Sequence, residues 1–107
     1  MKRVAILVRS ASHKNGNAGE ALRGAVGLAA GGLDVRVVLL EDGVGALALG
    51  GEAQKALSVL RALGREVLLE TESCDARGLC APEWTRTIAR DQLPQFLAGC
   101  DAVEAWR

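Results

Sequence analysis

The chain has 107 residues, half of them apolar, and its 13 basic and 13 acidic side chains balance. A chain of this length buries roughly 60 to 65% of its unfolded surface in one core, so we expect a single domain. The sequence has no basic cluster that would indicate nucleic acid as a partner. Its first apolar run is too short for a signal-peptide core or a membrane span, and we therefore expect a cytoplasmic protein with no membrane partner.

Three cysteines, Cys74, Cys80 and Cys100, lack the CxxC spacing that is typical of zinc and thioredoxin motifs. A reducing compartment keeps such cysteines as thiols. We therefore expect no structural disulfide, no metal and no cofactor.

Apolar periodicity predicts alternating strands and helices. Residues 4–8 are continuously apolar, which is typical of a strand covered on both faces, and apolar residues at helical spacing predict a helix over 17–30, ended by Gly31 and Gly32. By the same criteria we expect strands at 35–40, 66–71, 86–89 and 102–106, an apolar turn at 44–49, and helices at 52–63 and 91–98, the latter with Asp91 as its N-cap. This order predicts an α/β fold with a mostly parallel sheet of about five strands flanked by helices.

Loops that follow parallel strands share one edge of the sheet, where open α/β proteins bind ligands. We expect the loops at residues 10–17, 41–44 and 70–78 to line one pocket there. In the third loop, Cys74 follows the end of a buried strand, beside Ser73 as a candidate N-cap. The functional interpretation is a reactive thiol in an accessible hollow, and the structural one is a small side chain packed under the turn.

The local charges around Cys74 are mixed. A helix N-terminus lowers the pKa of a thiol, and Arg77 would add to this effect. Glu70, Glu72 and Asp75 oppose it. These carboxylates are the main argument against a strongly activated nucleophile.

Other polar residues of these loops are candidates for binding roles. Ser10 and its neighbours precede a helix N-terminus and could hold a phosphate, so nucleotide or flavin binding is a lesser alternative, although the GxGxxG and GxxxxGKS/T patterns are missing. His13, the only histidine, could act as a general base or proton shuttle. Asp42 could pair with Glu41 as acid and base, or the two could form an ordinary turn.

Three stretches together resemble the DsrE/DsrF family of small sulfur-relay proteins, and its TusC-like subunits in particular. They are the opening KRVAILVRSASHKNG, VVLLEDGV and the turn DARGL, and the closing LAGCDAVEAW is similar to the family's last helix and strand. The resemblance implies a compact α/β fold that assembles into homo-oligomers or hetero-oligomers. It also implies a cysteine that takes sulfane sulfur from a donor protein and passes it to an acceptor protein as a persulfide.

Alignment on Arg77 and Gly78 puts the family's sulfur-carrying cysteine at Glu70 and a second family cysteine at Ser73. Two hypotheses follow from this departure. In the first, the Cys74 thiolate attacks the sulfane sulfur of a donor persulfide, Ser73 stabilises the anion, and Arg77 assists or docks a partner. In the second, the chain is a non-catalytic assembly subunit of an oligomeric sulfur-transfer complex.

Overall fold

Strands and helices alternate along the chain, as the apolar pattern predicts. The structure is a computed structural model, and it describes residues 2–10, 17–48 and 50–106. Its elements are β1 (Arg3–Val8), α1 (Asn17–Ala30), β2 (Asp34–Leu39), the 3-10 helix η1 (Glu41–Ala48), α2 (Gly51–Ala62), β3 (Glu66–Glu70), α3 (Thr71–Ala76), β4 (Arg86–Ile88), the 3-10 helix η2 (Arg90–Gln92), α4 (Leu93–Ala98) and β5 (Ala102–Trp106).

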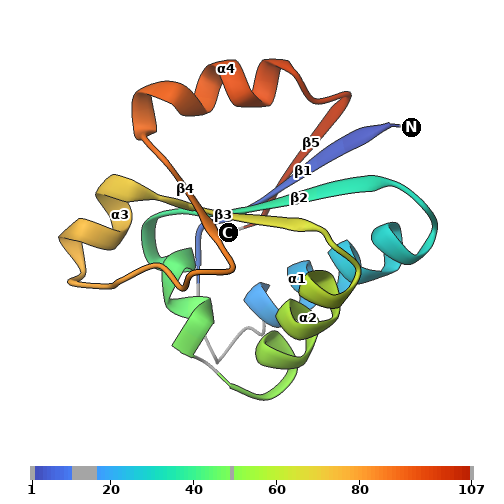
Figure 1. Ribbon diagram of the computed structural model, residues 1–107, viewed down its shortest axis with the longest axis horizontal. Helices are drawn as coiled ribbons and strands as arrows, with labels where there is room; N and C mark the ends of the chain where they lie inside the picture. The colour runs from blue at the N-terminus through green and yellow to red at the C-terminus, as the bar shows by residue number, and fades with distance from the viewer. Residues whose placement is uncertain (1, 11–16, 49, 107) are drawn as a thin grey trace.

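The strands form one five-stranded sheet in the order β4-β3-β2-β1-β5, and every neighbouring pair is parallel. Helices α1 and α2 cover one face of this sheet, and α4 covers the other (Figure 1). The predicted single α/β domain with a parallel sheet of about five strands is therefore confirmed.

Two cores lie on opposite faces of the sheet. The larger one packs alternate strand residues such as Ile6 and Val37 against α1 and α2. The smaller one packs Leu7, Val38 and Leu68 under α4. Because β1, β2 and β3 are covered on both faces, their sequences are continuously apolar rather than alternating.

Some predicted boundaries are wrong by a few residues. Thr71 begins α3 instead of ending β3, and Asp91 lies inside η2 rather than capping α4. Pro94 stands in the first turn of α4, where its fixed φ suits a helix start, and the 3-10 turn η2 precedes that helix. The expected apolar turn at 44–49 belongs largely to η1.

None of the helices in the described parts of the chain has the length and apolar character needed to cross a membrane.

Candidate functional site at the carboxyl edge of the sheet

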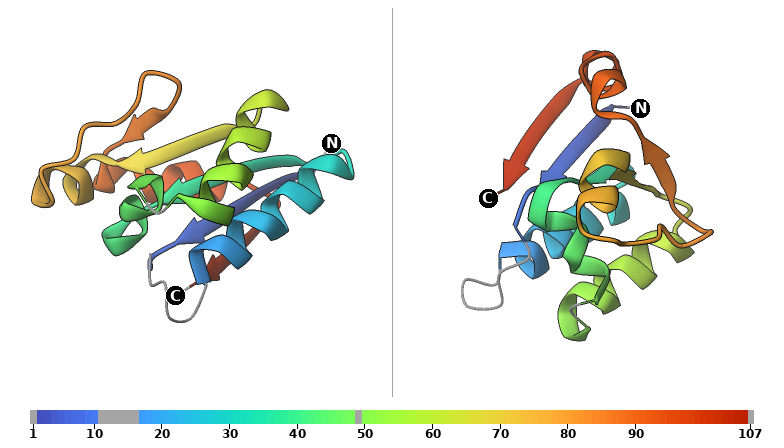
Figure 2. Two further views of the ribbon diagram at one scale, coloured as in Figure 1. Left: turned by 90° about the horizontal axis from the view of Figure 1, so that it is seen from below. Right: turned by 90° about the vertical axis from the view of Figure 1, so that its left-hand side faces the viewer.

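The strands point toward one edge of the sheet, where η1 and α3 lie close together (Figure 2). We call this the carboxyl edge. The backbone N–H of Glu41 donates to Ser73 Oγ at 2.8 Å, and Arg77 Nη2 donates to Asp42 Oδ1 at 2.7 Å. The structure thus brings the second and third predicted loops together. Most of the first loop, including His13, lies outside the described residues, and Ser10 follows β1.

Two backbone features hold η1 tightly against the strand ends. A Cβ at Gly43 would lie only 1.8 Å from the carbonyl oxygen of Val8, so only glycine fits there without a shift of the backbone. Glu41 has a φ of 53°, in the left-handed region that non-glycine residues rarely adopt. Such a backbone persists only where its surroundings determine it, and the hydrogen bond from Glu41 to Ser73 is one of these constraints.

A buried carboxylate lies at the centre of the edge. Glu70 is 2% exposed at the end of β3. Its Oε1 accepts a hydrogen bond of 2.5 Å from Ser73 Oγ and forms an ion pair of 3.0 Å with Arg90 Nη2. Glu72 also contacts Arg90: its Oε1 accepts a hydrogen bond of 2.8 Å from the backbone N–H of Arg90. The segment after β4 is therefore hydrogen-bonded to both the end of β3 and the start of α3.

The hydrogen bonds to Glu70 decide its charge state. Burial alone raises the pKa of this carboxyl, but the hydrogen bonds from Arg90 and Ser73 and the charges of Arg90 and Arg77 outweigh it. The net effect is a pKa below the usual value. Glu70 is therefore a carboxylate at neutral pH, and its ionised form is what the surrounding groups stabilise.

The Cys74 thiol is not exposed at this edge. Its residue is 4% exposed and belongs to the larger core, so the structure contradicts the interpretation of an accessible sulfur and agrees with that of a side chain packed under the turn. The physical reason is that α3 begins at Thr71, which turns Ser73 and Cys74 to the inner side of this short helix. Burial raises the pKa of the Cys74 thiol, Asp75 adds to the rise, and Arg77 opposes it. A thiol in this setting is protonated at neutral pH, and its role as a sulfur carrier stays a prediction.

Ser73 and Arg77 have structural partners of their own. Ser73 does not cap α3, because Glu70 is the N-cap residue and Ser73 lies within the helix. Arg77 Nη1 donates to the carbonyl oxygen of Ser73 at 3.2 Å while its other contacts reach Asp42. Both side chains therefore join α3 to the loops beside it.

Arg90 is the site residue that the sequence analysis missed. It follows the short strand β4, whose carboxyl end lies at the same edge as those of β2 and β3. The rule that collected the other three loops would have found it if applied to this strand. Arg90 completes the partners of Glu70.

Within the part of the chain that the structure describes, no group of three His, Cys, Asp or Glu side chains is arranged to hold a metal ion. The three cysteines are free: Cys74 is buried, Cys100 half-buried and Cys80 exposed. Cys80 is thus the cysteine most open to a thiol reagent.

The architecture defines a DsrE-like class of flavodoxin-like α/β domain. No protein-family model matches the chain, and no curated protein sequence matches it significantly. The comparison with solved structures carries the assignment of the fold.

The ychN protein of E. coli is similar to this chain with a TM-score of 0.86 and 25% identity over 98% of this chain and 99% of ychN. Protein MTH1491 of Methanobacterium thermoautotrophicum, of unknown function, is similar with a TM-score of 0.77 and 15% identity over 97% of this chain and 99% of MTH1491. Protein BT1422 of Bacteroides thetaiotaomicron, also of unknown function, is similar with a TM-score of 0.75 and 12% identity over 97% of this chain and 94% of BT1422. The last two show the fold alone.

Proposed function

We propose that the chain is a non-catalytic subunit of an oligomeric sulfur-relay assembly, which binds sulfur-carrying partner subunits without holding sulfane sulfur on its own thiol. One observation carries the proposal: the two positions at which the family resemblance expects cysteines hold Glu70 and Ser73, and these are hydrogen-bonded to each other. The likeness to ychN is compatible with a sulfur-relay role.

Persulfide chemistry needs a thiolate that can reach its donor. A carboxylate at position 70 has no sulfur to carry a persulfide, and its Oε1 is already bonded to Arg90 and Ser73. The adjacent thiol of Cys74 is buried, which disfavours both the thiolate and the approach of a donor. The carboxyl edge is therefore better suited to holding a fixed shape than to turnover.

Sulfur transfer through Cys74 is the second candidate. It is supported by the place of Cys74 just beyond the end of β3 and by the positive charge of Arg77, which lowers the thiol pKa. For a donor to reach it, α3 or its C-terminal turn must open. That turn is closed by a hydrogen bond of 2.9 Å from the Leu79 N–H to the Cys74 carbonyl oxygen.

Persulfide mapping separates the two candidates. Folded protein is incubated with glutathione persulfide, alkylated and mapped by mass spectrometry, with Cys80→Ser as the background so that the exposed thiol does not react. We expect no added sulfur on Cys74 in the folded protein and added sulfur after unfolding in urea. The unfolded sample is the control that the thiol can react with the donor once it is accessible. A sulfur atom on Cys74 in the folded chain would establish it as the carrier and overturn the non-catalytic assignment.

A matched pair of variants tests the position itself. The cysteine side chain is shorter than that of glutamate, so Glu70→Cys leaves room for a donor beside the Arg90 side chain, which is 63% exposed and whose charge lowers a thiol pKa. We therefore expect this variant to load sulfur at residue 70. Glu70→Ser is the control without a thiol. Native mass spectrometry of the unmodified chain tests the assembly half of the proposal: a defined oligomer is expected, and a monomer at all concentrations would contradict it.

A further inference from the structure

A hollow lies between α2, the end of η1 and the segment 82–84. It has a volume of about 250 Å³. Its apolar wall is made by Leu47, Leu57, Pro82 and Trp84, and its polar side by Gln54, Ser58 and Arg61. Most small-molecule sites have this composition: an apolar cavity with a few placed polar groups.

The polar side of the hollow comes from one helix. Gln54, Ser58 and Arg61 stand at i, i+4 and i+7 on α2, a spacing that puts them on one face. In the described parts of the chain, none of these three side chains has a hydrogen bond or a carboxylate partner of its own. Their donors and acceptors are thus available to a molecule in the hollow.

The guanidinium group of Arg61 is positioned by the ring of Trp84. Its guanidinium carbon lies 5.4 Å from the centroid of the Trp84 ring, a cation–π contact that orients the planar group. Stacking uses the face of a guanidinium and leaves its N–H edge free for a carboxylate. Trp84 is itself packed against the larger core, so the cation is positioned by a side chain that the fold supports.

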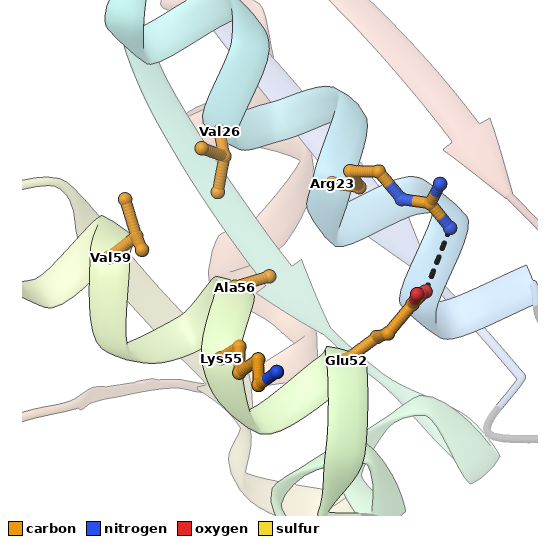
Figure 3. Close-up of a pocket in the computed structure, with 6 residues that line it drawn as sticks. All are labelled: Arg23, Val26, Glu52, Lys55, Ala56 and Val59. Atoms are coloured by element: carbon orange, nitrogen blue, oxygen red, sulfur yellow. Dashed lines mark hydrogen bonds and ion pairs between the residues drawn. The ribbon is translucent and has the colours of Figure 1, made fainter.

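The groove on the other side of α2 shows the contrast. Between α1 and α2, Arg23 Nη2 is neutralised by Glu52 Oε2 at 2.8 Å (Figure 3). Arg61 has no such carboxylate among the described residues. Of the two grooves beside α2, only the one with Arg61 offers an arginine that a ligand anion could pair with.

We propose that the hollow between α2 and residues 82–84 binds a small monocarboxylate with an apolar body. The carboxylate pairs with the N–H edge of Arg61, and Gln54 and Ser58 supply further hydrogen bonds. The apolar body packs on Leu57, Pro82 and the Trp84 ring edge. A single lining cation favours one negative charge over a phosphate dianion.

Phenylacetate is a suitable probe, followed through the indole N–H signal of Trp84 in nitrogen-15 NMR spectra, with the Trp106 signal as an internal reference. We expect a saturable shift at Trp84, and uncharged phenylacetamide should bind far more weakly. Arg61→Gln should weaken binding about ten- to hundredfold, since a charge-assisted hydrogen-bonded pair is lost. Lys55 is a cation on the same helix, but its side chain lines the other groove (Figure 3). Lys55→Gln should therefore leave binding unchanged.

Three results would overturn the proposal. They are no saturable shift at Trp84, equal binding of phenylacetamide, and equal weakening by Lys55→Gln. Displacement of phenylacetate by inorganic phosphate at matching concentration would overturn the assignment to monocarboxylates. Arg61 is exposed on α2, so its substitution leaves the core intact and a loss of binding reports on the hollow.

Discussion

Two glutamates of the same strand, four residues apart, have opposite surroundings. Glu66 at the amino end of β3 is paired with Arg36 at 2.8 Å and Arg86 at 2.7 Å, and its side chain is 27% exposed. Arg36 also contacts Asp34, which in turn contacts Arg3, so charges alternate across four strands. Glu70 at the carboxyl end has one arginine and one hydroxyl, and its side chain is 3% exposed.

The difference separates a stabilising surface from a constrained site. Partly solvated ion pairs contribute little and are screened by salt, so the network at the amino end is a surface feature that tolerates change. A buried carboxylate must be compensated by well-placed partners. The carboxyl edge combines such a carboxylate with the unusual φ of Glu41 and the close approach at Gly43, which is the pattern expected of a position under functional constraint.

Gly43→Ala should break this edge with the largest effect. The new Cβ would meet the Val8 carbonyl at 1.8 Å, and backbone cannot move aside as a flexible side chain does. We expect a loss of about 3 kcal/mol or more in the free energy of unfolding, measured in urea. Gly24→Ala is the control, because a Cβ there meets nothing within 4 Å. It should stabilise α1 by about 0.5 to 1 kcal/mol, and equal losses in both variants would contradict the close approach.

Ser73→Ala should have an intermediate effect. It removes the hydroxyl that donates to Glu70 in a buried bond and accepts from the Glu41 N–H in a partly buried one. A loss of about 1 to 3 kcal/mol is expected, because the Glu41 N–H loses its acceptor and the buried Glu70 carboxylate keeps only Arg90 as a donor among the described residues. Ser58→Ala on the exposed face of α2 is the control and should change stability by no more than about 0.5 kcal/mol. If the two serine variants unfold alike, the Glu70 network is not a constraint.

The fold was predictable because its signals are local. Continuous apolar runs at β1, β2 and β3 identified covered parallel strands, and the spacing of alanine and leucine identified α1 and α2. The sequence predicted a parallel sheet but not its strand order, β4-β3-β2-β1-β5, which depends on contacts between segments far apart in the chain. The boundary at Thr71 failed because Glu66 to Thr71 reads as one strand by propensity, whereas the helix is set by contacts of α3 with η1.

The sequence predicted where the site lies in the fold, but not the orientation of its side chains. Parallel strand ends brought residues 41–44 and 70–78 together as expected. The direction of Cys74 depended on where α3 begins, and a shift of two or three residues turns a helical side chain from surface to core. The strand-end rule places Arg90 at the same edge, but no local pattern shows that it pairs with Glu70, 20 residues earlier.

Glu66 and Glu70 each pair with an arginine whose guanidinium group is largely in water. Removing either arginine should therefore have a smaller effect than the changes at Gly43 and Ser73. Arg90→Gln removes the partner of Glu70. The pKa of Glu70 in the folded chain lies below its usual value of 4.5, so the stability that Arg90 contributes is present above about that pH and is lost as the pH falls through the folded pKa. The loss of stability in Arg90→Gln should therefore be greatest near neutral pH and shrink in acid.

Arg86→Gln is the matched control for this prediction, because it removes an exposed arginine from the other glutamate of β3. Glu66 keeps Arg36 as a partner, so we expect the smaller loss of stability and one that high salt reduces further. Urea unfolding of both variants at neutral and acid pH measures the difference. If the two variants lose stability in parallel at every pH, Arg90 is only another surface partner, and the distinction between the two ends of β3 would not hold.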